Sequence, residues 1–301
     1  MPYQSIFRPD LFKGQSILVT GGGSGIGRCT AHELAALGAR VALAGRKREK
    51  LETVQREIAD ATGRADAATI HVCDIREEET VKATVANVIG AHGRIDGLVN
   101  NAGGQFPAPL KDISGKGWDA VVRNNLTGCF LMSREVYNQS MAQHGGAIVN
   151  MLADIWMGMP GMGHSGASRG GILNFTETAA IEWAPVRINA VAPGLIASSG
   201  LDTYDEPFKQ SIRERYKQIP AGRFGTESEV AAAIVYLLSP AAAFISGVAL
   251  RIDGAVPHAK RIWPHTGNGT KSPAFDGFHL ASFPKVLQDG GTEGYKYNKI
   301  S

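Results

Sequence analysis

The stretch MGHSGASRGG, residues 162–171, holds the side chains best suited to chemistry. A helix is predicted here, and it places Ser165 and Arg169 four positions apart on one face. Both side chains donate hydrogen bonds and the arginine stays protonated, so the pair could hold an oxygen that gains negative charge during a reaction. His164, next to Ser165, and Asp154, just beyond the preceding strand, are candidate proton donors.

The same residues also have plain structural interpretations. Ser165 could serve only as a residue of the helix N-terminus, where serine is a good cap. Arg169 could be a surface partner of a carboxylate, and His164 a polar residue whose hydrogen bonds are all made. The sequence leaves both sets of interpretations open.

A second motif, TGGGSGIG at residues 20–27, follows the apolar run SILVT and precedes a helical pattern. In such a turn the first glycine allows a tight bend, the second lets a pyrophosphate approach the backbone, and the third lets the helix pack closely on the strand. Free N–H groups at the helix start attract phosphate. The loop is therefore predicted to bind a dinucleotide through Gly21, Ser24, Gly25, Ile26 and Gly27.

The end of the second strand indicates which dinucleotide binds. NAD-binding folds usually place an acidic residue here, but ALAGRKREK offers Arg46, Lys47 and Arg48 before the first carboxylate, Glu49. A guanidinium suits a 2′-phosphate because it can donate two hydrogen bonds to it. We predict NADP(H) as the cofactor and Arg46 as its main phosphate ligand.

These motifs need a scaffold of alternating strands and helices. Between residues 15 and 255, short apolar runs alternate with amphipathic stretches, which predicts a doubly wound, Rossmann-like α/β domain with a parallel sheet covered on both faces. A lead of residues 1–14 precedes this domain. Residues 198–225 form a long insertion of the kind that often makes a lid, and residues 256–301 read as an extended C-terminal arm.

Composition narrows the class of protein. The 301 residues are 44% hydrophobic and 20% charged, which is typical of a globular protein with a sizeable core. A net charge of +3, from 31 basic and 28 acidic residues, is too weak to indicate nucleic-acid binding. The three cysteines lack metal-ligand spacing, and no apolar run is long enough for a membrane span. We expect a cytoplasmic enzyme with a small-molecule substrate and no metal.

The motifs, in their order, resemble the short-chain dehydrogenase/reductase family over residues 12–254. The matches are TGGGSGIG, CDI, NNAG, NNLTG, INAVAPG and the closing IDGA. The resemblance implies that Asn125 helps to organise the active site, and that the protein is a homotetramer or a dimer built through the helices with Asn125 and Ser165. It also implies cofactor contacts from Asp74, Ile75, Asn101, Ala102, Gly103, Pro193, Gly194, Ile196 and Ser198.

The catalytic motif departs from the family pattern. Where members carry Tyr-x-x-x-Lys, this chain has Ser165 and Arg169, and Leu152 and Ala153 stand where a serine is usual. A serine hydroxyl is far less acidic than a phenol, so alcohol–ketone interconversion is disfavoured. Reduction of the 2,3 double bond of a trans-2-enoyl thioester needs mainly oxyanion stabilisation, which Asn125, Ser165 and Arg169 could supply.

NNAGGQF and HSGASRGG resemble the branch with the peroxisomal trans-2-enoyl-CoA and 2,4-dienoyl-CoA reductases. Two alternatives remain: a citronellol or citronellal dehydrogenase of terpenoid breakdown, also described for this branch, and a catalytically inactive NADP-binding sensor or oligomer partner. The enoyl reductase hypothesis assumes that no phenol takes part. A tyrosine from elsewhere in the fold, such as Tyr204, would overturn that assumption.

Overall fold

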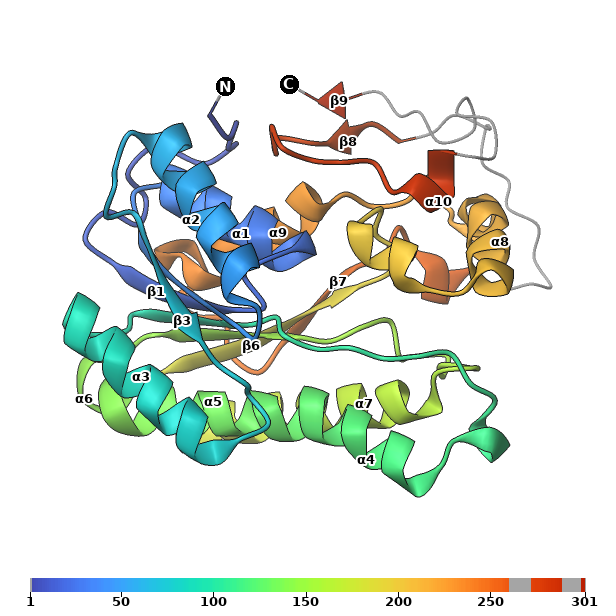
Figure 1. Ribbon diagram of the computed structural model, residues 1–301, viewed down its shortest axis with the longest axis horizontal. Helices are drawn as coiled ribbons and strands as arrows, with labels where there is room; N and C mark the ends of the chain where they lie inside the picture. Colours follow the sequence, from blue (N-terminus) through green and yellow to red (C-terminus); the bar gives the residue numbers. More distant parts are fainter. Residues whose placement is uncertain (1, 260–271, 289–298, 301) are drawn as a thin grey trace.

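The centre of the fold is a parallel sheet of seven strands in the order β3-β2-β1-β4-β5-β6-β7 (Figure 1). The computed structural model describes residues 2–259, 272–288 and 299–300. Every neighbouring pair in this sheet is parallel, which confirms the predicted doubly wound α/β fold. The strands are β1 (Ser16–Thr20), β2 (Arg40–Gly45), β3 (Ala68–Val72), β4 (Gly97–Asn100), β5 (Ala147–Met151), β6 (Arg187–Pro193) and β7 (Ala249–Ile252).

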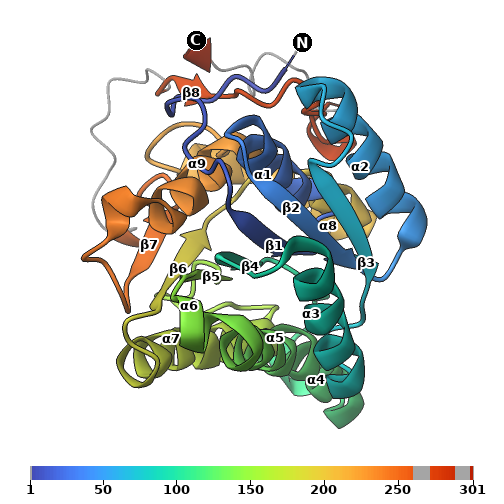
Figure 2. The same cartoon turned by 90° about the vertical axis from the view of Figure 1, so that its left-hand side faces the viewer.

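Helices cover both faces of the sheet (Figures 1 and 2). One layer contains α1, α2 and α9, and the other contains α3, α5 and α7. None of the helices in the described residues combines the length and apolarity that a bilayer crossing requires. The main helices are α1 (Gly25–Ala36), α2 (Arg48–Thr62), α3 (Glu78–His92), α7 (Gly163–Glu182) and α9 (Glu227–Leu238).

The strand β1 shows how the sheet joins the two layers. Ile17 and Val19 pack into the cluster with α1, α2 and α9, whereas Leu18 packs into the cluster on the other face. Successive side chains of a strand point to opposite faces, so a strand that is covered on both sides is apolar at most of its positions. All three side chains are buried, and each contributes roughly 1.5–3 kcal/mol by leaving water.

The long helical stretch that follows β4 is not regular. It runs from residue 115 to residue 144 and widens into π-helical turns at two places. Asn125 lies in the first of them. π-turns inside α-helices are frequent at functional sites, and nothing in the periodicity of the sequence indicates this one. The segments are α4 (Gly115–Val122), η2 (Arg123–Thr127), α5 (Gly128–Val136), η3 (Tyr137–Met141) and α6 (Ala142–His144).

The predicted lid, residues 198–225, folds into short helices at the carboxyl edge of the sheet. Its elements are η4 (Ser199–Thr203), α8 (Glu206–Arg215) and η5 (Tyr216–Gln218). Ile212, Ile219 and Phe224 of this segment form a separate apolar cluster with Val286 and Leu287 of the C-terminal arm. The lid and the arm therefore share one core.

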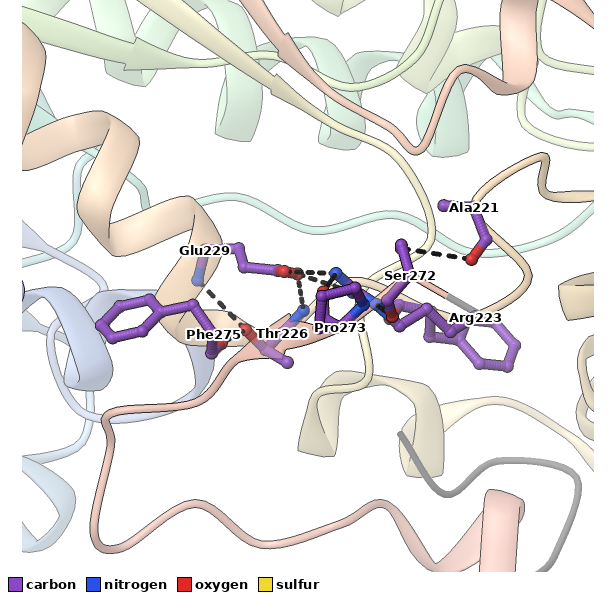
Figure 3. A network of polar contacts seen from close by, with 8 residues as sticks. Ala221, Arg223, Thr226, Glu229, Ser272, Pro273 and Phe275 are labelled. Carbon is purple, nitrogen blue, oxygen red and sulfur yellow. Dashed lines mark hydrogen bonds and ion pairs between the residues drawn. The ribbon is translucent and has the colours of Figure 1, made fainter. Parts of the chain in front are cut away.

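The described part of the arm packs on its own chain, next to α1, α8 and α9 (Figure 1). It includes β8 (Ala274–Phe275), which pairs with β9 (Lys299–Ile300), and α10 (Lys285–Gln288). Figure 3 shows the polar network that holds it: Arg223 donates to the carbonyls of Ser272 at 2.9 Å and Pro273 at 2.8 Å. Arg223 also pairs with Glu229 at 2.6 Å. Glu229 in turn accepts from the backbone of Thr226, so this network joins the arm to the start of α9.

We expect Arg223→Met to loosen the arm and to lower the free energy of unfolding by roughly 2–4 kcal/mol, because it removes several charge-assisted hydrogen bonds and leaves Glu229 without its cation. Urea unfolding measures the loss, and limited proteolysis with mass spectrometry should show faster cleavage within the arm. Arg56→Met on the exposed face of α2 is the matched control. Equal stability of the two variants would contradict this role of Arg223.

The N-terminal lead is held by a buried carboxyl group. Glu33 of α1 is completely buried and accepts hydrogen bonds from Tyr3 at 3.2 Å and Ser5 at 3.0 Å. Burial raises the pKa of Glu33 to about 7, although these two hydrogen bonds oppose the rise.

This carboxyl group predicts a pH dependence of stability. The folded protein keeps the Glu33 proton up to about pH 7, whereas an exposed glutamate loses it near pH 4.3. The folded state binds more protons between these values, so the free energy of unfolding falls as the pH rises through this window. We expect Glu33→Gln to be more stable than the wild type at pH 8, by on the order of 2 kcal/mol, and close to it at pH 4.5. Urea unfolding at both pH values tests this, and an equal difference at both would contradict it.

Candidate active site

The glycine loop between β1 and α1 lies at the carboxyl edge of the sheet. Gly21 and Gly25 have φ values of +67° and +57°, which side chains rarely adopt. A Cβ atom at Gly27 would overlap the carbonyl oxygen of Gly21, so the start of α1 can approach the loop only without a side chain. The third glycine thus has the packing position that the sequence predicted for it.

A cavity of about 270 Å³ opens beside this loop. It lies where β1 is flanked by β2 on one side and β4 on the other, and doubly wound sheets bind ligands at such a switch point. Of the predicted cofactor residues, the cavity lining contains Gly21, Ser24, Arg46, Asp74, Ile75, Asn101, Ala102 and Gly103.

The other predicted cofactor residues lie outside this lining. Gly25 and Gly27 belong to the loop itself, and Ile26 packs against the apolar core. Pro193 ends β6, and the chain then leads through Gly194, Ile196 and Ser198 into the lid. Ile196 is bridged to Gly225, so the two ends of the lid lie side by side.

Basic side chains gather at the end of the cavity near β2. Arg46, Lys47 and Lys50 all line it, whereas Arg48 is exposed and pairs with Glu52 at 3.7 Å. No carboxylate follows β2 within this lining. Sequence reasoning missed Lys50, which reaches the cavity because the first turn of α2 brings it back toward the strand.

Asp74 is the acidic residue of the lining, and its charge is already paired. Arg76 donates to both of its oxygens at 2.5–3.2 Å. The Arg76 guanidinium, hydrogen-bonded to Asp74, holds the pKa of this carboxyl below its usual range. This end of the cavity therefore keeps a positive character.

Asn101 joins the two strands that flank the switch point. Its Nδ2 donates to the carbonyls of Thr20 at 3.0 Å and Gly21 at 3.3 Å. The Thr20 hydroxyl accepts from the backbone N–H groups of Asn101 and Ala102, both at 3.0 Å. The NNAG motif is thereby fixed against the glycine loop.

Arg169 and Asn125 meet at the other end of this motif. A Cβ atom built on Gly103 would lie 2.7 Å from Arg169 Nη2 and 2.9 Å from Asn125 Oδ1, so both side chains contact this glycine. Asn125 Oδ1 accepts from the N–H of Gly104 at 2.9 Å, and its buried Nδ2 has no partner among the residues that the structure describes.

The guanidinium of Arg169 is not a surface group. Only 8% of the residue is exposed, Nη1 donates to the carbonyl of Met151, and the buried Nε finds no partner in the described part of the chain. Within the described residues no carboxylate lies at ion-pair distance from it. Burial lowers the pKa of Arg169 to about 10, which still leaves it charged at neutral pH. The interpretation of Arg169 as a surface ion pair is therefore wrong.

Ser165 is fully buried and makes a specific side-chain hydrogen bond. Its Oγ donates to Gln105 Oε1 at 2.6 Å, and it caps nothing, because α7 begins two residues earlier. Gln105 Nε2 donates to Tyr204 Oη at 3.2 Å. Sequence reasoning missed Gln105, although its place directly after NNAG, at the carboxyl end of β4, is a signal that could have identified it.

The two candidate proton donors have unused polar atoms. His164 is buried, its Nδ1 accepts from the N–H of Ser165 at 2.8 Å, and its Nε2 has no partner within residues 2–259, 272–288 and 299–300. Phe106 packs edge-on against the imidazole with ring centroids 4.5 Å apart. Asp154 has one buried oxygen that no described residue contacts by a hydrogen bond. Burial, and to a smaller extent the nearby Asp253, raises the pKa of Asp154.

Comparison with known proteins agrees with this geometry. A family model described as enoyl-(acyl carrier protein) reductase matches residues 21–256. The probable 2,4-dienoyl-CoA reductase of Bacillus subtilis is 34% identical over 245 residues, which are 80% of this chain and 95% of the relative. The peroxisomal 2,4-dienoyl-CoA reductase of Rattus norvegicus is 34% identical over 84% of this chain and 87% of its own length.

The chain belongs to the short-chain dehydrogenase/reductase family.

Among solved structures, this short-chain dehydrogenase/reductase is similar to a citronellol catabolism dehydrogenase of Pseudomonas aeruginosa. The two are 60% identical with a TM-score of 0.75, over 84% of this chain and 99% of the other. Members of the family bind nicotinamide cofactors, and its relatives act on small molecules. The family match begins within the glycine loop and ends after β7, so it contains both the cavity and the residues around Arg169.

Proposed function

We propose that this protein is an NADP(H)-dependent reductase of the 2,3 double bond of trans-2-enoyl thioesters. The observation that carries the proposal is Arg169, a buried cation with a backbone carbonyl as its acceptor and no carboxylate beside it within the described residues. An unpaired buried charge is costly. An acyl oxygen that becomes negative during the reaction would supply the missing partner.

The cavity suits the cofactor. Its glycine loop leaves room for a pyrophosphate, and Arg46, Lys47 and Lys50 can hold a 2′-phosphate that a carboxylate would repel. NADPH, when bound, supplies the hydride for Cβ of the substrate.

The protein's own groups then stabilise the charge that develops. Arg169 and Asn125 Nδ2 are donors for which the described residues supply no carboxylate or other side-chain partner, and both flank Gly103. They can grip the thioester oxygen as the enolate forms, and Ser165 lies on the same helix face as Arg169. Asp154 and His164 remain candidates for a proton donor.

A second candidate function is oxidation of a terpenoid alcohol or aldehyde. The specific observation in its favour is the 60% identity to the citronellol catabolism dehydrogenase. The absence of the family's tyrosine and lysine from α7 weighs against it, because alcohol oxidation needs a base at the hydroxyl. A third possibility is an inactive NADP-binding sensor, for which the loss of these catalytic residues is the support.

One assay separates the three functions. NADPH oxidation is followed at micromolar protein with crotonyl-CoA and with longer trans-2-enoyl-CoA thioesters. It is followed in parallel with citronellal, and the reverse direction is measured as reduction of NADP⁺ with citronellol. Turnover of the thioesters supports the proposal. Turnover only of the terpenoids favours the dehydrogenase, and NADPH binding without turnover of either set favours the sensor.

We also infer a homodimer or homotetramer built through the helices that carry Asn125 and Ser165. Phe130 on α5 is 38% exposed and Ile181 on α7 is 80% exposed, so this layer presents apolar side chains to its surroundings. Gly170 has an open space beside it that a neighbouring helix could fill. Size-exclusion chromatography with light scattering tests this, and a monomer would contradict it.

A further inference from the structure

Tyr204 brings a phenol into the hydrogen-bond chain of Ser165. The chain runs from Ser165 Oγ through the Gln105 amide to Tyr204 Oη, with steps of 2.6 Å and 3.2 Å. Its members come from α7, from the loop after β4 and from the end of η4. A phenol therefore lies two hydrogen bonds from the helix position where this chain has a serine instead of a tyrosine.

The directions of these two hydrogen bonds distinguish the serine hydroxyl from the tyrosine hydroxyl. Gln105 has one acceptor oxygen and one amino group, so its amide accepts from one hydroxyl and donates to the other. Here Ser165 Oγ donates a hydrogen bond to Gln105 Oε1, whereas Tyr204 Oη accepts one from Gln105 Nε2, which leaves the phenol proton unused by this amide. The hydroxyl that stays free to donate is the phenol, and phenols are far stronger acids than aliphatic alcohols.

The lid and the arm fix the tyrosine ring. Tyr204 packs against Phe208 of α8 with ring centroids 4.7 Å apart, and it belongs to the apolar cluster shared with the arm. Two residues before it, Asp202 accepts hydrogen bonds from the N–H groups of Lys285 at 3.2 Å and Val286 at 2.9 Å. The segment with the phenol is thus tied to α10 of the arm.

We propose that Tyr204 donates the proton that completes the reduction and that Gln105 is its positioning residue. This inference rests on the proposed function but gives up its assumption that no phenol takes part. Tyr204 does not occupy the position of Ser165; it is linked to that position through Gln105. Hydride addition to Cβ moves the π electron pair onto the thioester oxygen as an enolate. A C–H bond then forms at Cα with the proton of Tyr204 Oη, and the enolate pair restores the C=O bond. The phenolate is stabilised by the donating Gln105 Nε2 and takes a proton back from water.

Tyr204→Phe tests this step with little change in packing, because the ring stays in place. We expect kcat with crotonyl-CoA to fall about 10²-fold or more, with the Kd for NADPH within about twofold of the wild type. In D₂O the wild type should place deuterium on one face of Cα. The variant should give a mixture of both faces, because solvent then delivers the proton. A residue that only packs the lid would not change this stereochemistry.

Gln105→Leu and Tyr137→Phe complete the experiment. The glutamine variant keeps the phenol but not its orientation, so we expect a smaller loss of kcat and partial loss of facial selectivity. Tyr137 is stacked on Trp183, far from the hydrogen bonds of Ser165, Gln105 and Tyr204. Its variant is the control for removing a phenol hydroxyl, and it should change neither kcat nor the facial selectivity.

Different experimental results would contradict this inference and the proposed function. Thioester turnover with full kcat and selectivity in Tyr204→Phe would overturn the role of Tyr204 and leave the function intact. If the wild type turns over only citronellal or citronellol, the proposed function fails, and a 10²-fold loss in Tyr204→Phe with those substrates would still support the phenol as the proton-transferring group. A wild type that is inactive with both substrate sets contradicts both.

Discussion

Arg169→Met should lower kcat for enoyl thioesters by about 10²–10³-fold, which is the usual effect of removing one donor from an oxyanion site. The Kd for NADPH should stay within about twofold of the wild type, because the guanidinium faces Gly103 and Asn125 and lies outside the basic end of the cavity. Steady-state NADPH oxidation gives kcat, and fluorescence titration gives the Kd.

The same variant should not lose stability. Replacing a buried ion pair by apolar side chains of similar size is often neutral or stabilising by about 1–4 kcal/mol, and Arg169 carries the desolvation cost of burial without the gain of a carboxylate partner. We therefore expect an equal or higher free energy of unfolding in urea, together with the loss of activity. A buried arginine that served only the fold would behave in the opposite way.

Arg187→Met is the matched control. Arg187 is also partly buried, but it donates to three carbonyls, those of Leu237 at 2.6 Å, Leu238 at 3.0 Å and Ser239 at 3.3 Å. It lies at the start of β6, at the edge of the sheet opposite the one with Gly103. Its variant should lose stability and keep the kcat of the folded fraction. Loss of activity only in proportion to unfolding, in both variants, would sink the oxyanion role of Arg169.

Arg46→Ala should raise the Kd for NADPH by about 10–100-fold, which corresponds to the roughly 1.5–3 kcal/mol of hydrogen bonds to a charged group. The Kd for NADH should change by less than about threefold, because NADH lacks the phosphate that Arg46 is proposed to bind. Lys47 and Lys50 remain in the cavity lining, so some preference for NADPH should survive.

Arg48→Ala serves as its control, because Arg48 lies two residues further along the chain, outside the cavity, and pairs with Glu52. Its Kd for NADPH should match that of the wild type. An equal loss of NADPH affinity in the two variants would indicate a general electrostatic effect. An equal loss of affinity for NADH and for NADPH in Arg46→Ala would contradict binding of the 2′-phosphate by Arg46.

The cofactor half of the site could be predicted from the sequence because its contacts are local. A strand, a glycine turn and a helix follow one another within residues 16–36, and the glycines are needed where the backbone meets itself. The parallel sheet could also be predicted, since strands buried on both faces are mostly apolar runs. Asp74, Asn101 and Gly103 line the cavity because every parallel strand ends at the same edge.

The substrate half could not be predicted in this way. Gln105 and Ser165 are 60 residues apart in the chain, and Gln105 and Tyr204 are 99 apart. Helical and strand periodicity do not predict which distant loops come into contact. They also do not predict the π-helical turn in which Asn125 contacts Gly103. The sequence did predict that Ser165 and Arg169 of α7 are hydrogen-bond donors on one helix face. Whether Arg169 is buried, what Ser165 binds and where a phenol lies depend on the packing of the lid and the arm over the sheet edge.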